Sequence, residues 1–398
     1  MGSASTTDLN GEGQGSYPSQ AEEPLLGVAP RPSGARFYLP SLDGVRAVAF
    51  LLTFWVHAGQ PMKAEATGFV GHLDTALVTI GAYGVPLFFT MSAYLVTRLL
   101  LLERERTGAV DVRAFIVRRT VRIWPVYYAA VLIAAIALRT TTIFAPARTN
   151  LWVDLGYAVF MGDLVHAFAG GVGYSILWSL GVEEKFYLLW PWAVRKLSAE
   201  RLRRLGWGLV ALGIVSAFLI APFGTDDMVA RLPITNAAAF GYGIVMACGG
   251  LVVPRSLAAR ASGAWLTPAF LVALLVAVVA GAPFIALRPT YYLAVGGVLG
   301  PAVAAGYFAI AKEARSGFLT WRPMVEIGKR SYGAYVIHYA LVLAATNLVA
   351  NHRGAAYFGL SLGALALTLA LAFLSYRYFE TPFLRLKARF ERVPSRPI

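Results

Sequence analysis

Long apolar stretches recur along the chain from residue 44 onward, and each is long enough to cross a lipid bilayer as a helix. A bilayer core needs about 20 mostly apolar residues in helical conformation. Ten stretches meet this requirement, at 44–60, 81–98, 123–142, 175–194, 207–223, 234–252, 265–287, 290–311, 331–350 and 355–376. The pattern therefore predicts an all-α, polytopic integral membrane protein with about ten transmembrane helices.

One further apolar segment, 152–169, contains the polar residues Asp154, Asp163 and His166. If this segment crossed the membrane, the basic cluster that follows the fourth span would fall on the outer side. Such an arrangement would contradict the positive-inside rule. We therefore expect 152–169 to be a non-spanning or re-entrant segment.

The distribution of Lys and Arg orients the predicted helices. With ten spans and the N-terminus inside, 28 of the 35 Lys and Arg residues fall in or next to the inner segments, and six fall in the outer ones. Cytoplasmic segments of membrane proteins carry such an excess of basic residues. We therefore place both termini in the cytoplasm and expect a multi-pass protein of the inner, or plasma, membrane.

Composition along the chain divides it into three regions. Residues 1–36 are rich in Ser, Gly, Pro, Gln and Glu, so they have too few apolar side chains to form a core. We expect them to be a disordered cytoplasmic tail. The transmembrane domain is predicted to cover 37–387, and 388–398 is predicted to be a second cytoplasmic tail.

Overall composition excludes several classes of protein. Hydrophobic residues make up 58% of the chain and charged residues 14%, which excludes most soluble enzymes. Basic cytoplasmic loops explain the net charge of +14, so no nucleic-acid partner is expected. Cys248 is the only cysteine, which excludes an intrachain disulfide and a cysteine-based metal cluster. The spacing of His and carboxylate residues gives no reason to expect a metal site either.

The first predicted span contains two ionisable residues, Arg46 and His57. At 100° and 1.5 Å per residue, eleven residues bring them onto the same helix face, roughly 16 Å apart along the axis. Ionisable residues inside a membrane are costly and often functional, so the pair indicates the wall of a polar path. The alternative is an arginine whose side chain reaches the membrane surface and a histidine hydrogen-bonded between helices.

The fourth predicted span reads WSLGVEEKFYLLWPW and contains Ser179, Glu183, Glu184 and Lys185. Ser179 and Glu183 are four residues apart and therefore share a helix face. Two carboxylates and an ammonium within one span indicate an internal polar cavity. The alternative is a structural ion pair, for example between Lys185 and Glu184.

The second inner loop, from Arg98 to Arg122, carries seven arginines, and three of them lie just before the third span: Arg118, Arg119 and Arg122. Guanidinium groups bind phosphate oxygens well, so this cluster is a candidate phosphate site. Anionic lipid headgroups or a purely topological role would explain it equally well. His338, in the ninth span, lies close in sequence to Tyr335 and is either structural or part of the same polar cavity.

Six sequence stretches together resemble one known family, the membrane-bound acyltransferase 3 family of bacterial O-acyltransferases. The matching stretches are SLDGVRAVAFLLTFWVHAG at 41–59, GVPLFFTMSAYLVTRLLLLERERTG at 84–108, FIVRRTVRIWPVYY at 115–128, WSLGVEEKFYLLWP at 178–191, SYGAYVIHYA at 331–340 and SYRYFETPFLRL at 375–386. The resemblance covers almost the whole chain from residue 41 to residue 387. Any one stretch alone would be a weak signal, but their order and combination are specific.

The resemblance implies transfer of an acyl group, usually acetyl, from cytoplasmic acyl-CoA to a hydroxyl group, commonly on a carbohydrate or glycosylated acceptor. In this family the acceptor often lies on the far side of the membrane. No bound cofactor is implied, because acyl-CoA, usually acetyl-CoA, acts as a co-substrate. Membrane lipid is the remaining expected partner.

The family's motifs also imply roles for single residues. His57 corresponds to the catalytic histidine and Arg46 to its companion arginine. Ser179 and Glu183 match the Ser-x-x-x-Glu motif, and Ser92 matches the serine of the second span. The basic motif associated with the acyl-CoA donor is matched by Arg118, Arg119 and Arg122.

Elementary chemistry agrees with these roles. An alcohol is a poor nucleophile until a base takes its proton, and His57 is the best-placed base. Either Arg46 or a backbone N–H could stabilise the oxyanion of the thioester, and Glu183 could orient His57 or bind an acceptor hydroxyl. Direct transfer and a route through an acylated His57 are both open.

A transporter or flippase of a sugar- or lipid-linked substrate is the alternative function. In that interpretation Arg46, His57 and Glu183 form a relay for protons or substrate inside the membrane. A relay explains the intramembrane charges, but it does not explain the arginine cluster or the ordered set of family motifs.

Overall fold

The computed structural model describes residues 37–59, 68–140, 150–169, 175–254, 256, 265–281, 289–314, 317–348 and 355–393. Regular secondary structure in these residues is entirely helical, which confirms the all-α prediction. The predicted tail at 1–36 lies outside the described residues, as does the end of the second tail at 394–398.

Each of the ten predicted apolar stretches overlaps a helix, and some of these helices extend several residues beyond the stretch. These helices are α1 (Pro40–Ala58), α3 (Gly84–Thr107), α4 (Val112–Thr140), α7 (Trp178–Lys196), α8 (Ala199–Ile220), α10 (Ala237–Ala247), α12 (Leu266–Gly281), α13 (Pro289–Ala311), α15 (Ser331–Leu348) and α16 (Ala355–Leu374). Five helical stretches are long and apolar enough to span a membrane: Ala76–Thr107, Val112–Thr140, Ala199–Ile220, Leu293–Ala311 and Tyr357–Ala388. The count of ten crossings and the side of each terminus therefore stay predictions.

Shorter helices fill the space between these elements. Helices α2 (Gly68–Gly81), α9 (Asp226–Arg231) and α14 (Arg322–Lys329) precede α3, α10 and α15, respectively. A six-residue π-helix, Ser375–Glu380, joins α16 to α17 (Thr381–Ala388). Its wider turns place Glu380 against α15, where a Cβ on Gly333 would lie 2.6 Å from Glu380 Oε1.

Segment 152–169 does not form one continuous helix. It folds into α5 (Leu151–Ala158) and α6 (Gly162–Ala169), each of eight residues and hence about 12 Å long. Phe160, in the turn between them, has a positive φ of 58°. Neither helix is long enough to cross a bilayer alone, which agrees with the expectation that this segment does not span the membrane.

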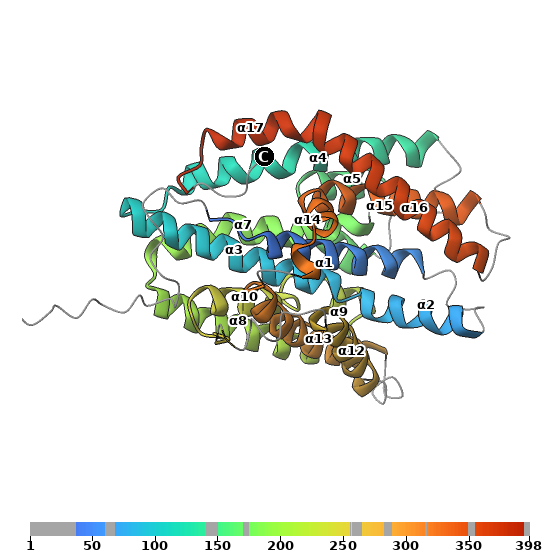
Figure 1. Cartoon of the computed structure of the whole chain (residues 1–398), viewed down its shortest axis with the longest axis horizontal. Coiled ribbons are helices and arrows are strands. Elements are labelled where there is room, and N and C mark those ends of the chain that lie inside the picture. The colour runs from blue at the N-terminus through green and yellow to red at the C-terminus, as the bar shows by residue number, and fades with distance from the viewer. Residues whose placement is uncertain are drawn as a thin grey trace, which may run out of the picture.

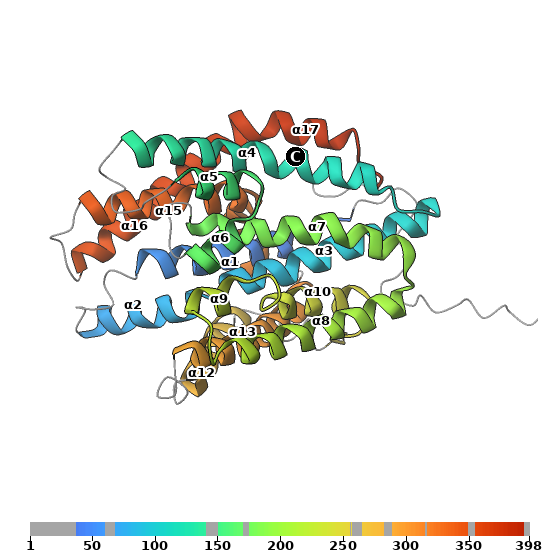
Figure 2. The same ribbon diagram turned by 180° about the vertical axis from the view of Figure 1, so that it is seen from behind.

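The helices pack with α1, α3 and α7 through the middle of the molecule. Helices α4, α15, α16 and α17 lie on one side of this centre, and α8, α10, α12 and α13 lie on the other (Figures 1 and 2). Helix α1 is buried along most of its length. A Cβ on Gly328 of α14 would lie 1.7 Å from the backbone oxygen of Asp43, so glycine allows α14 to pack directly on the start of α1.

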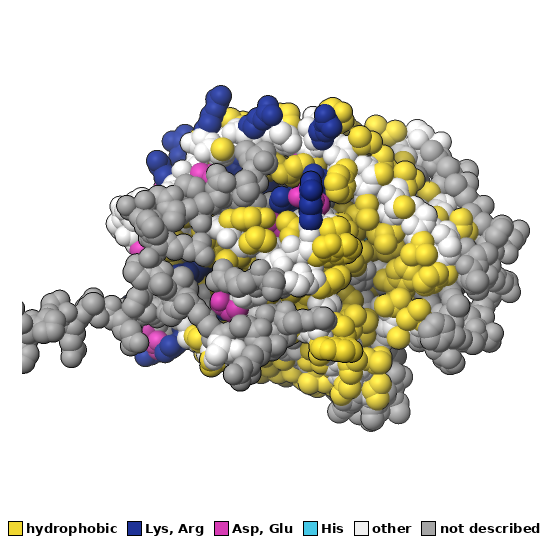
Figure 3. Space-filling model, viewed as in Figure 1, with side chains coloured by type: hydrophobic (Ala, Val, Ile, Leu, Met, Phe, Trp, Pro, Cys, Tyr) yellow, Lys and Arg dark blue, Asp and Glu magenta, His cyan; other side chains and the backbone are white. Residues whose placement is uncertain are grey.

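Most of the predicted inner segments meet at one end of the molecule, which we call the basic end. Arg104, near the end of α3, donates to the backbone oxygens of Val194 and Leu197 at the end of α7. Ser41, at the start of α1, donates to the backbone oxygen of Lys312, just after α13. On the face in Figure 3, Lys and Arg side chains gather over one half and along α17, while the other half is mostly apolar.

Candidate active site

A cavity of about 150 Å³ lies between α1, α3, α4, α7 and α15, toward the basic end. Helical spacing brings its polar side chains together from five separate elements. Six of the site residues predicted from the sequence line this main cavity: Arg46, Ser92, Arg119, Arg122, Ser179 and Glu183. Two others, His57 and Arg118, are not part of its wall.

Arg46 is held in place by a carboxylate that the sequence analysis did not single out. Its Nη1 donates to Asp43 Oδ1 at 2.5 Å, and Asp43 Oδ2 accepts a hydrogen bond from the Tyr38 hydroxyl at 3.0 Å. Asp43 is completely buried, and the Arg46 side chain is 14% exposed. Asp43 directly precedes the predicted first span, and its spacing of three residues from Arg46 was the signal that could have identified the pair. Arg46 therefore faces an internal cavity and does not extend along the protein surface.

Glu183 lies among hydroxyl groups and cations on the wall formed by α7. It interacts with the hydroxyls of Ser92 and Tyr187, and with the charges of Arg119 and Arg122. Ser92 and Tyr187 also hydrogen-bond to each other. The Arg119 guanidinium lies 5.0 Å from the Tyr187 ring centroid, in a cation–π contact. A carboxylate in this position balances part of the positive charge of the cavity.

Ser179 and Tyr335 connect α7 to α15 at the cavity wall. Their hydroxyl oxygens are 2.5 Å apart, and the Tyr335 hydroxyl also donates to the backbone oxygen of Ile176 at 2.9 Å. Both hydroxyls are buried. Ser179 therefore orients Tyr335, which shares the cavity wall with Glu183.

His57 lies beyond Tyr335, next to His338. The His57 Nδ1 atom is 2.9 Å from the backbone oxygen of Thr53 and 3.3 Å from His338 Nε2. A carbonyl oxygen only accepts hydrogen bonds, so the network assigns the proton of neutral His57 to Nδ1. The Nε2 atom of His57 then carries the lone pair, and it has no hydrogen-bond partner among the described residues.

His338 adopts the matching tautomer. Its Nδ1 atom is 2.6 Å from the backbone oxygen of Tyr335 and must donate, which leaves Nε2 to accept from His57. His338 is completely buried, and its ring contacts the rings of Phe50, Phe54 and Tyr335. The sequence left open whether His338 lines the cavity. The structure places it behind Tyr335, as the link between the cavity wall and His57.

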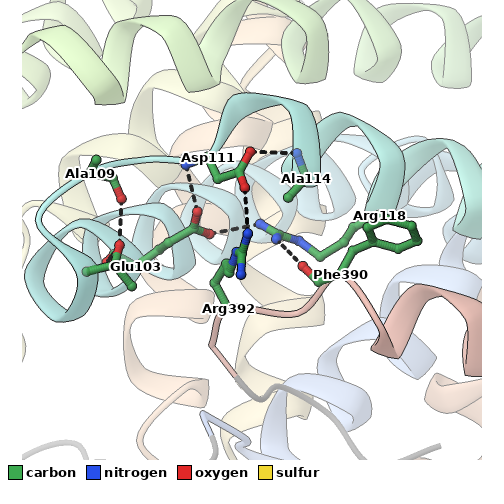
Figure 4. Close-up of polar contacts among 8 residues, drawn as sticks. Glu103, Ala109, Asp111, Ala114, Arg118, Phe390 and Arg392 are labelled. Atoms are coloured by element: carbon green, nitrogen blue, oxygen red, sulfur yellow. Dashed lines mark hydrogen bonds and ion pairs between the residues drawn. The ribbon is translucent and has the colours of Figure 1, made fainter.

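Arg118 lines a smaller cavity of about 50 Å³. Arg119 and Arg122 line both this smaller cavity and the main cavity. The Arg118 guanidinium donates to Glu103 Oε2 at 2.9 Å and to the backbone oxygen of Phe390 at 2.6 Å (Figure 4). The three arginines of the motif therefore have different surroundings. Arg119 and Arg122 face both cavities, whereas Arg118 ties α4 to α3 and to the segment after α17.

Lys185 pairs with Asp163, so the suggested ion pair between Lys185 and Glu184 is a wrong prediction. Lys185 Nζ is 2.6 Å from Asp163 Oδ1 and donates to the backbone oxygens of Phe160 and Gly181. The pair holds the α5–α6 hairpin against α7. Glu184 Oε1 is buried and has no hydrogen-bond partner in the described part of the chain.

A second polar cluster lies on α6 and α9. Arg231 donates to His166 Nδ1 at 2.5 Å and pairs with Asp227. Arg231 lies outside the predicted spans, so the pattern of intramembrane charges did not point to it. Within the described residues, no group of three or more His, Cys, Asp or Glu side chains could hold a metal ion.

Comparison with known proteins gave one family and several relatives. A family model described as an acyltransferase domain matches residues 39–377. The peptidoglycan O-acetyltransferase OatA of Listeria monocytogenes is 27% identical over 385 residues, which cover 87% of this chain and 56% of that protein. The O-acetyltransferase OatA of Staphylococcus aureus is 28% identical over 376 residues, covering 87% of this chain and 57% of that protein. The chain thus spans little more than half the length of these relatives, and no solved structure matches it significantly.

Proposed function

Because the chain belongs to the acyltransferase 3 family, we propose that it is a membrane O-acyltransferase that transfers an acyl group from acyl-CoA to a hydroxyl of a carbohydrate or glycosylated acceptor. The names of the relatives support acetyl as the group and a glycan as the acceptor. The apolar helices support a membrane location.

The hydrogen bonding of His57 carries this proposal. Thr53 and His338 both contact Nδ1, so the Nε2 lone pair is available as a base. A general base must have its lone pair directed at the reacting hydroxyl, and a fixed Nδ1–H provides that orientation. The partly buried position of His57 agrees with an acceptor that approaches this ring from outside the main cavity.

In the proposed reaction, Nε2 of His57 first accepts a proton and later donates it. Nε2 of His57 takes the proton of the acceptor hydroxyl while the hydroxyl oxygen forms a bond to the thioester carbonyl carbon. The tetrahedral intermediate then collapses, the carbon–sulfur bond breaks, and the leaving CoA thiolate takes the proton from His57. In the alternative route, Nε2 bonds to the thioester carbon and the carbon–sulfur bond breaks to release CoA thiolate. The acceptor hydroxyl oxygen then bonds to the acyl carbon, the nitrogen–carbon bond to His57 breaks, and the hydroxyl proton neutralises the thiolate.

Arg46, Arg119 and Arg122 are proposed to bind the donor. Arginine is well suited to phosphate and carbonyl oxygens, and all three line the main cavity. Sites for whole drug-sized ligands measure roughly 300–1,000 Å³. A cavity of about 150 Å³ is therefore proposed to take the acyl end of the donor and to leave the nucleotide part at the basic end.

The direct test uses purified protein in lipid nanodiscs with radiolabelled acetyl-CoA and candidate acceptors, including peptidoglycan fragments. Acceptor-dependent appearance of an acetyl ester, with release of CoA, is the expected result. The parallel test compares the glycans of cells with and without the gene by mass spectrometry. Acceptor uptake into vesicles without any acetylation would instead support the transporter alternative.

A further inference from the structure

The smaller cavity at the basic end, which we call the basic-end cavity, contains a lysine from the segment near the C-terminus. Its walls come from α3, α4, α17 and the residues directly after α17. The charged residues that line it are Glu103, Arg118, Arg119, Arg122, Lys387 and Glu391. Four cations and two carboxylates give this lining a net positive charge, which suits an anionic group.

The two carboxylates of the basic-end cavity are held differently. Glu103 is almost completely buried and binds both Arg118 and the backbone N–H of Asp111 (Figure 4). Glu391 lies after the end of α17 and pairs with Lys387 at 2.8 Å, with both side chains partly exposed. Glu103 is therefore a fixed part of the wall, whereas Glu391 is more exposed and contacts the lysine that an anionic ligand would also contact.

The position of the basic-end cavity relates it to the proposed donor site. It shares Leu99, Arg119 and Arg122 with the main cavity, so a ligand group in one lies next to a ligand group in the other. The main cavity is too small for a whole acyl-CoA. The charged part of a donor whose acyl end enters the main cavity would then reach the basic-end cavity.

We propose that the basic-end cavity binds a phosphate group of the acyl-CoA donor and that Lys387 donates to this phosphate. Glu391 pairs with Lys387 when the donor is absent and is displaced when it binds. This inference rests on the proposed donor and adds a binding residue outside the arginine motif. Lys387 also extends the donor site to the residues that follow the last long helix.

Two substitutions that break the same ion pair separate this proposal from a structural role. Lys387→Ala removes a phosphate ligand, so the donor KM should rise about ten-fold, as expected for loss of one charge-assisted hydrogen bond. Glu391→Gln removes the competing carboxylate, so the donor KM should fall several-fold. A pair that merely stabilised the fold would make the two variants change in the same direction.

The experiment measures donor and acceptor KM and CoA binding for both variants in nanodiscs of zwitterionic lipid. Arg385→Ala is the matched control, because Arg385 is exposed on α17 and lines neither cavity. Lys387→Arg should restore the donor KM to within about three-fold of wild type, and the acceptor KM should not change. Thermal denaturation of each variant checks folding.

Shifts of the donor KM in the same direction, or no shift in either variant, would overturn the inference. A Lys387→Ala effect that appears only when anionic lipid is added would assign the phosphate to a lipid headgroup and would also overturn it. These results differ from failure of the proposed function, in which the wild-type protein neither binds CoA nor acetylates any acceptor.

Discussion

His57 Nδ1 lies 3.3 Å from His338 Nε2, although 281 residues separate these histidines in the chain. Both rings have their Nδ1 atoms next to backbone oxygens, so the two tautomers are fixed together. This relationship makes His338 a positioning residue for His57. The backbone oxygen of Thr53 and the ring of His338 can therefore orient His57 without a carboxylate in contact with its ring.

Replacing His338 tests this relationship. His338→Phe keeps an aromatic ring among Phe50, Phe54 and Tyr335 but removes one of the two acceptors for the His57 Nδ1–H, leaving the Thr53 backbone oxygen. We expect kcat to fall about ten-fold, with both KM values unchanged, because His57 loses its fixed orientation and not its lone pair. Steady-state kinetics checks this split. A variant with normal kcat would show that Thr53 alone orients His57.

Arg46→Lys tests whether the guanidinium is needed. Arg46 binds Asp43 through Nη1 and lines the main cavity, and the compact ammonium of lysine does not reproduce the planar fork of a guanidinium. We expect kcat/KM for the donor to fall at least ten-fold while the protein remains folded. Near-normal donor kinetics would contradict a role for Arg46 in donor binding or oxyanion stabilisation.

The two neighbouring arginines Arg118 and Arg119 should behave differently. Arg119→Ala is expected to raise the donor KM about ten-fold, because Arg119 faces both cavities. Arg118→Ala leaves the buried Glu103 without its guanidinium partner, so its first effect should be a lower melting temperature. Donor titrations and thermal denaturation of the two variants provide the comparison. If Arg118→Ala instead raises the donor KM and Arg119→Ala instead lowers the melting temperature, Arg118 is the main donor ligand.

Gly328 provides a test of the packing that supports the site. A Cβ at this position would lie 1.7 Å from the backbone oxygen of Asp43, so Gly328→Ala must push α14 away from α1. We expect little folded protein, as measured by size-exclusion chromatography in detergent. Gly306→Ala is the control, because a Cβ there has no heavy atom within 4 Å. Equal yields of the two variants would contradict the close contact between α1 and α14.

Local patterns predicted the helices and one face of the cavity well. Each of the ten apolar stretches overlaps a helix, as expected if such runs satisfy their backbone hydrogen bonds internally in an apolar environment. Ser179 and Glu183 share a cavity wall, as their spacing of four residues indicates. These features depend on neighbours along the chain, which a sequence displays directly.

Contacts between distant segments could not be predicted in this way. The pairs His57–His338 and Lys185–Asp163 depend on which helices pack together, and residue spacing contains no information about that packing. For the same reason, residue spacing could not distinguish the surroundings of Arg118 from those of Arg119. The catalytic and donor-binding roles themselves stay predictions, because they concern chemistry with substrates.

We propose that the donor enters at the basic end, from the cytoplasm, and that His57 serves an acceptor that approaches from the opposite side of the membrane. Sealed right-side-out vesicles loaded with acetyl-CoA and supplied with external acceptor distinguish the sides from which the two substrates come. We expect wild-type vesicles to acetylate the external acceptor, and external acetyl-CoA should not substitute for internal acetyl-CoA. Vesicles with His57→Ala should acetylate the acceptor at least about 100-fold more slowly. Acetylation that requires both substrates on the cytoplasmic side would show that the acyl group does not pass through the membrane domain. A His57→Ala variant with wild-type turnover would show that His57 is not the base.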